Sequence, residues 1–162
     1  KAGTAAAALG VKMFNVHTLG GLKMMEAVRE AVDKTCKKDG QPIILGVTIL
    51  TSMDEKEIKL VGIQGPLEKR VLILAGLAKK AGLDGIVASP LEVKDIKKKL
   101  GKGFIAVIPG IRMPDSKPDD QHRTMTPKEA ISAGADYIVV GRPIREANDP
   151  LEAVNKILEE MR

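Results

Sequence analysis

The chain alternates short apolar runs, rich in β-branched residues, with amphipathic stretches of helical period. Runs of the first kind cover residues 13–17, 43–50, 85–89, 104–108 and 137–140. Continuous apolar runs of this length are typical of strands buried on both faces of a parallel sheet. Stretches of the second kind cover residues 21–37, 66–80, 91–100, 127–133 and 150–161, and residues 1–9 fit a helix already under way. This order predicts an α/β fold with a parallel sheet.

An internal repeat supports the same order. Residues 81–87 (AGLDGIV) are echoed by residues 133–139 (AGADYIV), and each copy predicts a helix end, a glycine cap, an Asp turn and a buried strand. Helix starts are marked at Ser89-Pro90, Thr126-Pro127 and Asp149-Pro150, where a capping side chain precedes a proline. Such units suit a (β/α)8 barrel or an open doubly wound sheet, although no G-x-G-x-x-G follows a strand, which argues against a dinucleotide fold.

Five strand–helix units are fewer than a complete barrel needs. A (β/α)8 barrel has eight strands and typically about 200 residues or more, whereas this chain has 162 residues. We therefore expect residues 1–162 to form a single domain, the C-terminal part of a (β/α)8 TIM barrel with about the last five units present. An autonomous open sheet is the alternative, and it would expose two unpaired edges.

Composition excludes several classes of protein. The single cysteine, Cys36, cannot form an intramolecular disulfide and fits a reducing, cytoplasmic location, and with only two histidines the chain offers no zinc cluster. No apolar run approaches the roughly 20 residues needed to span a bilayer. The net charge of +5 comes with two Phe, one Tyr and no Trp, so the stacking aromatics of a nucleic-acid binder are missing. A net positive charge of this size is compatible with an anionic ligand, and by itself it does not indicate any particular class of partner.

The end of the last predicted strand offers a phosphate site. Gly141, Arg142 and Pro143 follow the run 137–140. A glycine lets backbone N–H groups approach an anion closely, and an arginine can donate two hydrogen bonds to a phosphate. Phosphate often binds after strands seven and eight of a (β/α)8 barrel. The alternative is an ordinary turn with a surface arginine.

The connection after Ile108 exceeds the roughly 12 to 15 residues above which structureless loops are uncommon in compact domains. It reaches Thr126 and holds several donors to an anion: Arg112, Lys117, Gln121, His122 and Arg123. We expect a loop that closes over a ligand, with a disordered surface loop as the alternative. Further hydroxyls at Thr48, Thr51 and Ser52 lie in or just after the run 43–50 and could face a ligand or cap the next helix. His17, at the end of the run 13–17, could be a base or a ligand contact, although a histidine there is more often structural.

Several segments, in one order, carry a family resemblance. They are Asn15-Val16-His17, Gly20-Gly21 with Met24-Met25, Val47-Thr48 with Leu50-Thr51-Ser52, Gly82–Gly85, Pro109–Arg112, Asp120-Gln121 with Arg123 and Met125–Pro127, and Gly134–Tyr137 with Gly141–Pro143. Together they resemble the orotidine 5′-monophosphate decarboxylase family over nearly the whole chain. Each segment alone would be weak, and the combination is specific.

The resemblance implies a (β/α)8 barrel, usually a homodimer. It implies conversion of orotidine 5′-phosphate to uridine 5′-phosphate (UMP) and CO2 in pyrimidine biosynthesis, without metal or cofactor. By motif, Arg142 and Gln121 would hold the phosphate, helped by the backbone N–H of Gly141. Arg112 would contact the substrate from the base of the closing loop. Thr51 would contact the ligand from the fifth barrel strand, with Ser52 a lesser candidate for the pyrimidine.

The family's catalytic array does not match this chain. It combines a lysine on an early strand with a D-x-K-x-x-D motif at the end of the third strand. The one match here, residues 115–120, lies inside the long loop and contains a proline, so it cannot be the strand-end array. We expect no catalytic residue in this chain, which would supply substrate binding to a carboxy-lyase and be inactive alone. The alternatives are another enzyme on the same scaffold, such as a sugar-phosphate decarboxylase or aldolase-like barrel, and a non-catalytic half-barrel that binds a phosphorylated ligand or self-associates.

Overall fold

A computed structural model describes residues 1–114 and 123–162 of the chain. Its strands are β1 (Met13–His17), β2 (Ile43–Val47), β3 (Gly85–Val87), β4 (Ile105–Ile108) and β5 (Tyr137–Ile138). Its α-helices are α1 (Ala2–Ala8), α2 (Leu22–Thr35), α3 (Glu55–Leu60), α4 (Leu67–Lys80), α5 (Val93–Leu100), α6 (Pro127–Ala133), α7 (Arg142–Arg145) and α8 (Pro150–Glu160). Short 3-10 turns cover Thr18–Gly20, Lys38–Gly40 and Pro90–Glu92.

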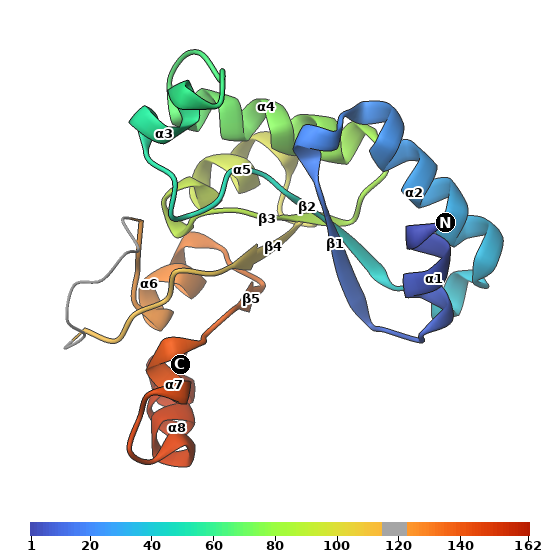
Figure 1. The fold of residues 1–162 in the computed structure, drawn as a ribbon. Helices are drawn as coiled ribbons and strands as arrows, with labels where there is room; N and C mark the ends of the chain where they lie inside the picture. Colours follow the sequence, from blue (N-terminus) through green and yellow to red (C-terminus); the bar gives the residue numbers. More distant parts are fainter. Residues whose placement is uncertain (115–122) are drawn as a thin grey trace.

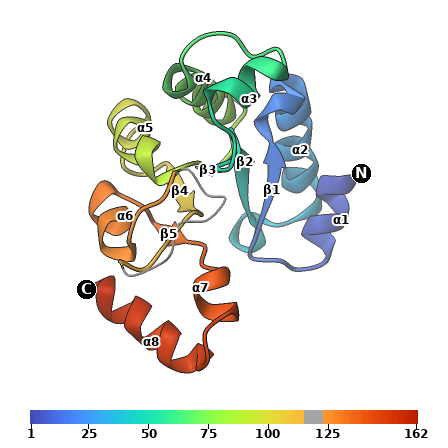
Figure 2. The ribbon, with the colours of Figure 1, turned by 60° about the vertical axis from the view of Figure 1, so that its left-hand side comes forward.

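The five strands form one parallel sheet in the order β1-β2-β3-β4-β5. Each strand pairs with the next strand in the sequence, and a helical connection joins the two (Figure 1). Figure 2 shows the strands on the inner side of an arc formed by α2, α4, α5, α6 and α8. Sequential parallel strands inside a layer of helices are the arrangement of a (β/α)8 barrel, so the predicted α/β fold class is confirmed.

The register gives the sheet two different faces. Ile44, Ile86 and Ala106 point toward the helices and are completely buried in the main core. Their neighbours along the strands point to the inner face, because successive side chains alternate across a sheet. The ladder aligns Val47, Val87, Val107 and Tyr137 there, and Tyr137 at the sheet edge is 48% exposed. The inner face is therefore apolar and only partly covered by the described residues.

Most predicted elements match the structure, and the differences have local causes. The predicted strand 43–50 ends at Val47, which pairs with Val87, the last residue of β3, and one further bond joins the Thr48 N–H to the Val87 carbonyl at 3.0 Å. The predicted caps at Ser89, Thr126 and Asp149 all accept backbone N–H groups of the following turn. Helix α3 was not predicted, and it is only six residues long with an Asp54 capping box.

The internal repeat has a structural role at the start of β3 and β5. Asp84 accepts a backbone N–H of β2 at 2.7 Å and the Arg29 guanidinium at 3.3 Å. Asp136 accepts a backbone N–H of β4 at 2.7 Å and the Lys97 ammonium at 2.6 Å. Each Asp thus ties its own strand to the preceding strand and to a cation on a helix.

Replacing Asp136 with alanine should lower the free energy of unfolding by about 1 to 3 kcal/mol. The change removes the acceptor of a β4 backbone N–H and the carboxylate partner of Lys97, whose side chain is only 10% exposed. Urea unfolding measures the effect. The matched control is Glu30→Ala, which breaks the solvent-exposed pair with Lys34 and should cost less than about 0.5 kcal/mol. Equal costs for both variants would contradict the role given to Asp136.

Candidate functional site

Two threonines bind neighbouring strands together at the carboxyl edge of the sheet. The Thr18 hydroxyl donates to the Val47 carbonyl at 2.8 Å, and the Thr48 hydroxyl donates to the Val87 carbonyl at 3.1 Å. Both threonines are 1% exposed. Thr48 was expected either to face a ligand or to cap the next helix, and the structure supports neither role. Its buried hydroxyl bonds to the end of β3, and Asp54 caps α3.

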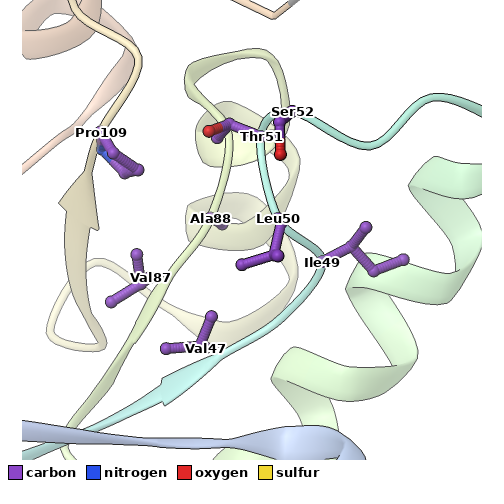
Figure 3. Close-up of a pocket in the computed structure, with 8 residues that line it drawn as sticks. All are labelled: Val47, Ile49, Leu50, Thr51, Ser52, Val87, Ala88 and Pro109. Carbon is purple, nitrogen blue, oxygen red and sulfur yellow. The ribbon is translucent and has the colours of Figure 1, made fainter. Parts of the chain in front are cut away.

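A small pocket of about 120 Å³ lies at this edge. It is lined by Val47, Ile49, Leu50, Thr51, Ser52, Val87, Ala88 and Pro109. In Figure 3 Thr51 and Ser52 lie at the upper end of the pocket, Pro109 lies across from them at the end of β4, and Val47 and Val87 lie below. A largely apolar pocket with two hydroxyls at one end can hold a small, mainly apolar group and give it a hydrogen-bond partner.

Arg112 lies at the base of the long loop after β4. Its backbone N–H donates to the Met125 carbonyl at 3.0 Å, and Ile111 and Met125 form an isolated parallel bridge. The two ends of the loop are therefore joined beside β4, as expected for a loop with a fixed base. The Arg112 guanidinium also donates to the Ile111 carbonyl at 2.7 Å. Arg112 is half-buried where the loop begins.

Gly141 and Arg142 follow β5 at the same edge of the sheet. The Val139 N–H bonds to the Ile108 carbonyl at 2.8 Å, which keeps this segment against the end of β4. A Cβ added at Gly141 would meet no described atom within 4 Å, so the described protein atoms do not require glycine there. Gly141 and Arg142 are not among the lining residues of the pocket at Thr51, and they lie at the far end of the same edge.

Arg123 does not serve as a free donor to an anion. It is 8% exposed, its guanidinium pairs with Glu92, and it also donates to the Leu50 carbonyl at 2.7 Å. Glu92 is 3% exposed and accepts the Ser89 backbone N–H at 2.8 Å. The expectation that Arg123 could donate to an anion is therefore wrong, because both ends of its guanidinium bond within the protein.

The pKa of Glu92 is raised from 4.5 to about 7. The main cause is burial, which removes the carboxylate from water, and the charge of Arg123 and the Ser89 N–H oppose it. A group with a raised folded-state pKa contributes stability that is full below the unfolded pKa and is lost as the pH rises through the folded pKa. For Glu92 this window runs from about pH 4.5 to about pH 7.

Replacing Glu92 with glutamine should flatten the pH dependence of stability. Between pH 5 and pH 8 the unchanged protein should lose up to about 3 kcal/mol from this group, because a buried carboxyl must ionise. The variant has no proton to lose there. Urea unfolding at the two pH values measures the difference. Glu129→Gln is the control, because Glu129 is exposed and its pKa is lowered by bonds to Thr126, and this variant should keep the slope. Parallel slopes for all three proteins would contradict the assignment.

One of the remaining candidate site residues is exposed, and the others lie outside the part of the chain that the structure describes. His17 is exposed at the end of β1. Lys117, Gln121, His122 and the D-x-K-x-x-D match at 115–120 lie outside the described residues. Sequence reasoning missed Glu92 as a member of the site region. The signal was available, since Glu92 stands among apolar neighbours in Pro90-Leu91-Glu92-Val93.

The described residues contain neither a cluster placed to hold a metal ion nor a helix that could span a membrane. Among residues 1–114 and 123–162, no group of three or more His, Cys, Asp or Glu side chains is placed to hold a metal ion. No helix in the same part of the chain is both long and apolar enough to cross a bilayer.

The sequence and the structure of this chain are both similar to those of one family of known proteins. A sequence profile of the orotidine 5′-phosphate decarboxylase / HUMPS family matches residues 1–157. A protein of Legionella pneumophila (strain Lens) named orotidine 5′-phosphate decarboxylase is 51% identical over 161 residues, which cover 99% of this chain and 69% of that protein. A protein of Trichlorobacter lovleyi with the same name is 50% identical over 97% of this chain and 65% of its own length. The crystal structure of orotidine 5′-phosphate decarboxylase from Lactobacillus acidophilus superposes with a TM-score of 0.83 at 36% identity, covering 99% of this chain and 68% of that one.

Proposed function

This chain belongs to the orotidine 5′-phosphate decarboxylase / HUMPS family, and from that membership we propose that it provides the substrate-binding part of an orotidine 5′-phosphate decarboxylase. The complete enzyme releases CO2 from orotidine 5′-phosphate to leave UMP. The observation that carries the proposal is the placement of Thr51, Arg112 and Arg142 after strands β2, β4 and β5. All three follow the carboxyl edge of one parallel sheet, where (β/α)8 barrels bind their substrates.

Arg142, Gln121 and the backbone N–H of Gly141 hold the phosphate group in this proposal. A guanidinium can donate two parallel hydrogen bonds to phosphate oxygens. The open space beside Gly141 supports close approach of an oxygen to the backbone there. The phosphate would then lie at the β5 end of the edge.

Thr51 contacts the pyrimidine from the β2 end, with Ser52 as a lesser contact. Its hydroxyl stands at the end of an apolar pocket that suits a flat ring. Arg112, beside β4, contacts the substrate between the two ends. Binding energy from the phosphate can hold the substrate and close the loop while the reaction takes place at the distant ring.

The catalytic lysine and aspartates come from outside these 162 residues, and no metal or cofactor takes part.

We also propose a cytoplasmic homodimer. Leu19, Leu50 and Leu91 follow β1, β2 and β3 and are 59%, 47% and 54% exposed. Exposed apolar side chains after three neighbouring strands support an interaction surface at this edge, and Leu50 also lines the pocket at Thr51. Light scattering on the purified protein tests the dimer.

A second candidate function rests on the incomplete cover of the inner face. Tyr137 and Val139 are 48% and 51% exposed, and β1 and β5 each have one unpaired side among the described residues. A non-catalytic half-barrel could bind a phosphorylated ligand or self-associate through these strands. Higher association than a dimer, without nucleotide binding, would favour this candidate.

Incubation of the protein with orotidine 5′-phosphate, followed by chromatographic detection of UMP, tests the main proposal together with a binding titration. We expect UMP to bind and no UMP to form from orotidine 5′-phosphate. Formation of UMP by these 162 residues would contradict the placement of the catalytic groups elsewhere. Absence of UMP binding would contradict the proposal as a whole.

A further inference from the structure

Arg123 connects three segments that are far apart in the sequence. It lies after β4, yet its guanidinium reaches Glu92, 31 residues away, and the Leu50 carbonyl, 73 residues away. Glu92 in turn accepts the Ser89 N–H at 2.8 Å. The Arg123–Glu92 pair therefore joins the segment after β2, the turn after β3 and the segment after β4 at the carboxyl edge.

The same pair is fixed to the base of the long loop. Two residues after Arg123, the Met125 carbonyl accepts the Arg112 N–H at 3.0 Å, and the Met125 N–H donates to the Gly110 carbonyl at 3.4 Å. On the other side, the bonded carbonyl of Leu50 belongs to the residue that directly precedes Thr51. A shift of the Arg123 guanidinium would thus move Thr51 and Arg112 relative to each other.

Stability alone is a poor reason for this arrangement. Both side chains are almost fully buried, and the cost of removing two charged groups from water can exceed their mutual attraction. The Nε of Arg123 is also buried without a hydrogen-bond partner among the described residues, which is a further cost. Apolar residues of similar size often replace buried ion pairs without loss of stability.

We propose that Arg123 and Glu92 are positioning residues, which hold the Thr51 segment and the Arg112 segment at the separation that the nucleotide requires. The pair acts through the Leu50 carbonyl and the Gly110–Met125 bonds and does not touch the ligand. This inference rests on the proposed function in so far as it names UMP as the ligand. The physical reason is that small displacements of binding groups weaken recognition strongly, even when all the groups are present.

The test compares Arg123→Met with Arg29→Met in the full chain. Methionine keeps much of the length of the side chain and removes the bonds to Glu92 and Leu50. Arg29 makes a half-buried pair with Asp84 at the opposite edge of the sheet, so Arg29→Met controls for loss of an arginine–carboxylate pair. Hydrogen exchange by mass spectrometry, well below both melting temperatures, reports on the backbone of residues 48–53 without any ligand. Calorimetry reports the affinity for UMP.

We expect Arg123→Met to speed exchange in residues 48–53 and to weaken UMP binding about tenfold, the size of one lost well-placed contact. Arg29→Met should change neither by more than about twofold, and Arg123→Lys should fall between, because one ammonium cannot reach both acceptors. If Arg123→Met does not fold, Arg123→Lys carries the comparison. Exchange in residues 48–53 that is no faster than in Arg29→Met overturns the proposal. If the unchanged protein binds no UMP, the proposed function fails, and the exchange result still decides whether the pair positions the Thr51 segment.

Discussion

Replacing Arg142 with alanine should weaken UMP binding roughly 100-fold, which corresponds to about 3 kcal/mol. Arg142 begins α7, directly after the glycine that follows β5. If its guanidinium donates two hydrogen bonds to the phosphate, alanine removes both and leaves the anion without its main cation. Calorimetric titration with UMP measures the change. Arg142→Lys keeps the charge and loses the two-pronged geometry, so it should lie between the two proteins.

The matched control for this prediction is Arg145→Ala on the same short helix. Arg145 pairs with Glu146 at 3.1 Å, and both side chains are largely exposed. The variant removes the same charge from the same helix, at a side chain that is exposed and already paired with Glu146. Its affinity should stay within about twofold, because solvent and salt screen an exposed, paired charge. If Arg142→Ala and Arg145→Ala bind UMP equally well, Arg142 is not the phosphate ligand.

Replacing Gly85 with alanine should destabilise the protein by about 3 kcal/mol or more. A Cβ at this position would overlap the Ile105 carbonyl oxygen and would lie 2.6 Å from the Ile105 Cβ. Gly85 begins β3 and pairs directly with Ile105 of β4, so the clash involves backbone that cannot move without opening the sheet. Thermal unfolding should show a melting temperature lower by roughly 6 to 12 °C for a chain of this size.

Gly76→Ala is the control for the effect of Gly85→Ala. Gly76 lies inside α4, and a Cβ there would meet no described atom within 4 Å. Alanine has a higher helix propensity than glycine, so this variant should be more stable by up to about 1 kcal/mol. The same chemical change is thus expected to have opposite signs at the two positions. A Gly85→Ala protein as stable as the unchanged one would contradict the close β3–β4 contact.

Local signals explain what the sequence could predict about the fold. The strand and helix order follows from apolar periodicity, and the helix starts at Thr126 and Asp149 follow from capping side chains beside prolines. The repeat around Asp84 and Asp136 was visible as a pattern. Its structural role was not visible, because Asp84 and Asp136 bond backbone N–H groups that lie 40 and 30 residues earlier in the chain.

The site shows the same division. The candidates Thr51, Arg112 and Arg142 were chosen from strand ends and family motifs, and each follows a strand at the carboxyl edge. Their roles in binding stay predictions. The Arg123–Glu92 pair could not be predicted, since only the folded sheet brings the ends of β2, β3 and β4 together. Charge type alone made Arg123 look like a donor to a ligand, and its burial against Glu92 shows a different use.

The most direct test of the account compares UMP with uridine in calorimetric titrations of this protein. The two ligands share the pyrimidine and the ribose and differ only in the phosphate. If Arg142, Gln121 and Gly141 hold the phosphate, UMP should bind at least about 100-fold more tightly than uridine. Equal affinities, or no binding of either ligand, would contradict the assignment of the carboxyl edge as a site for a phosphorylated nucleoside.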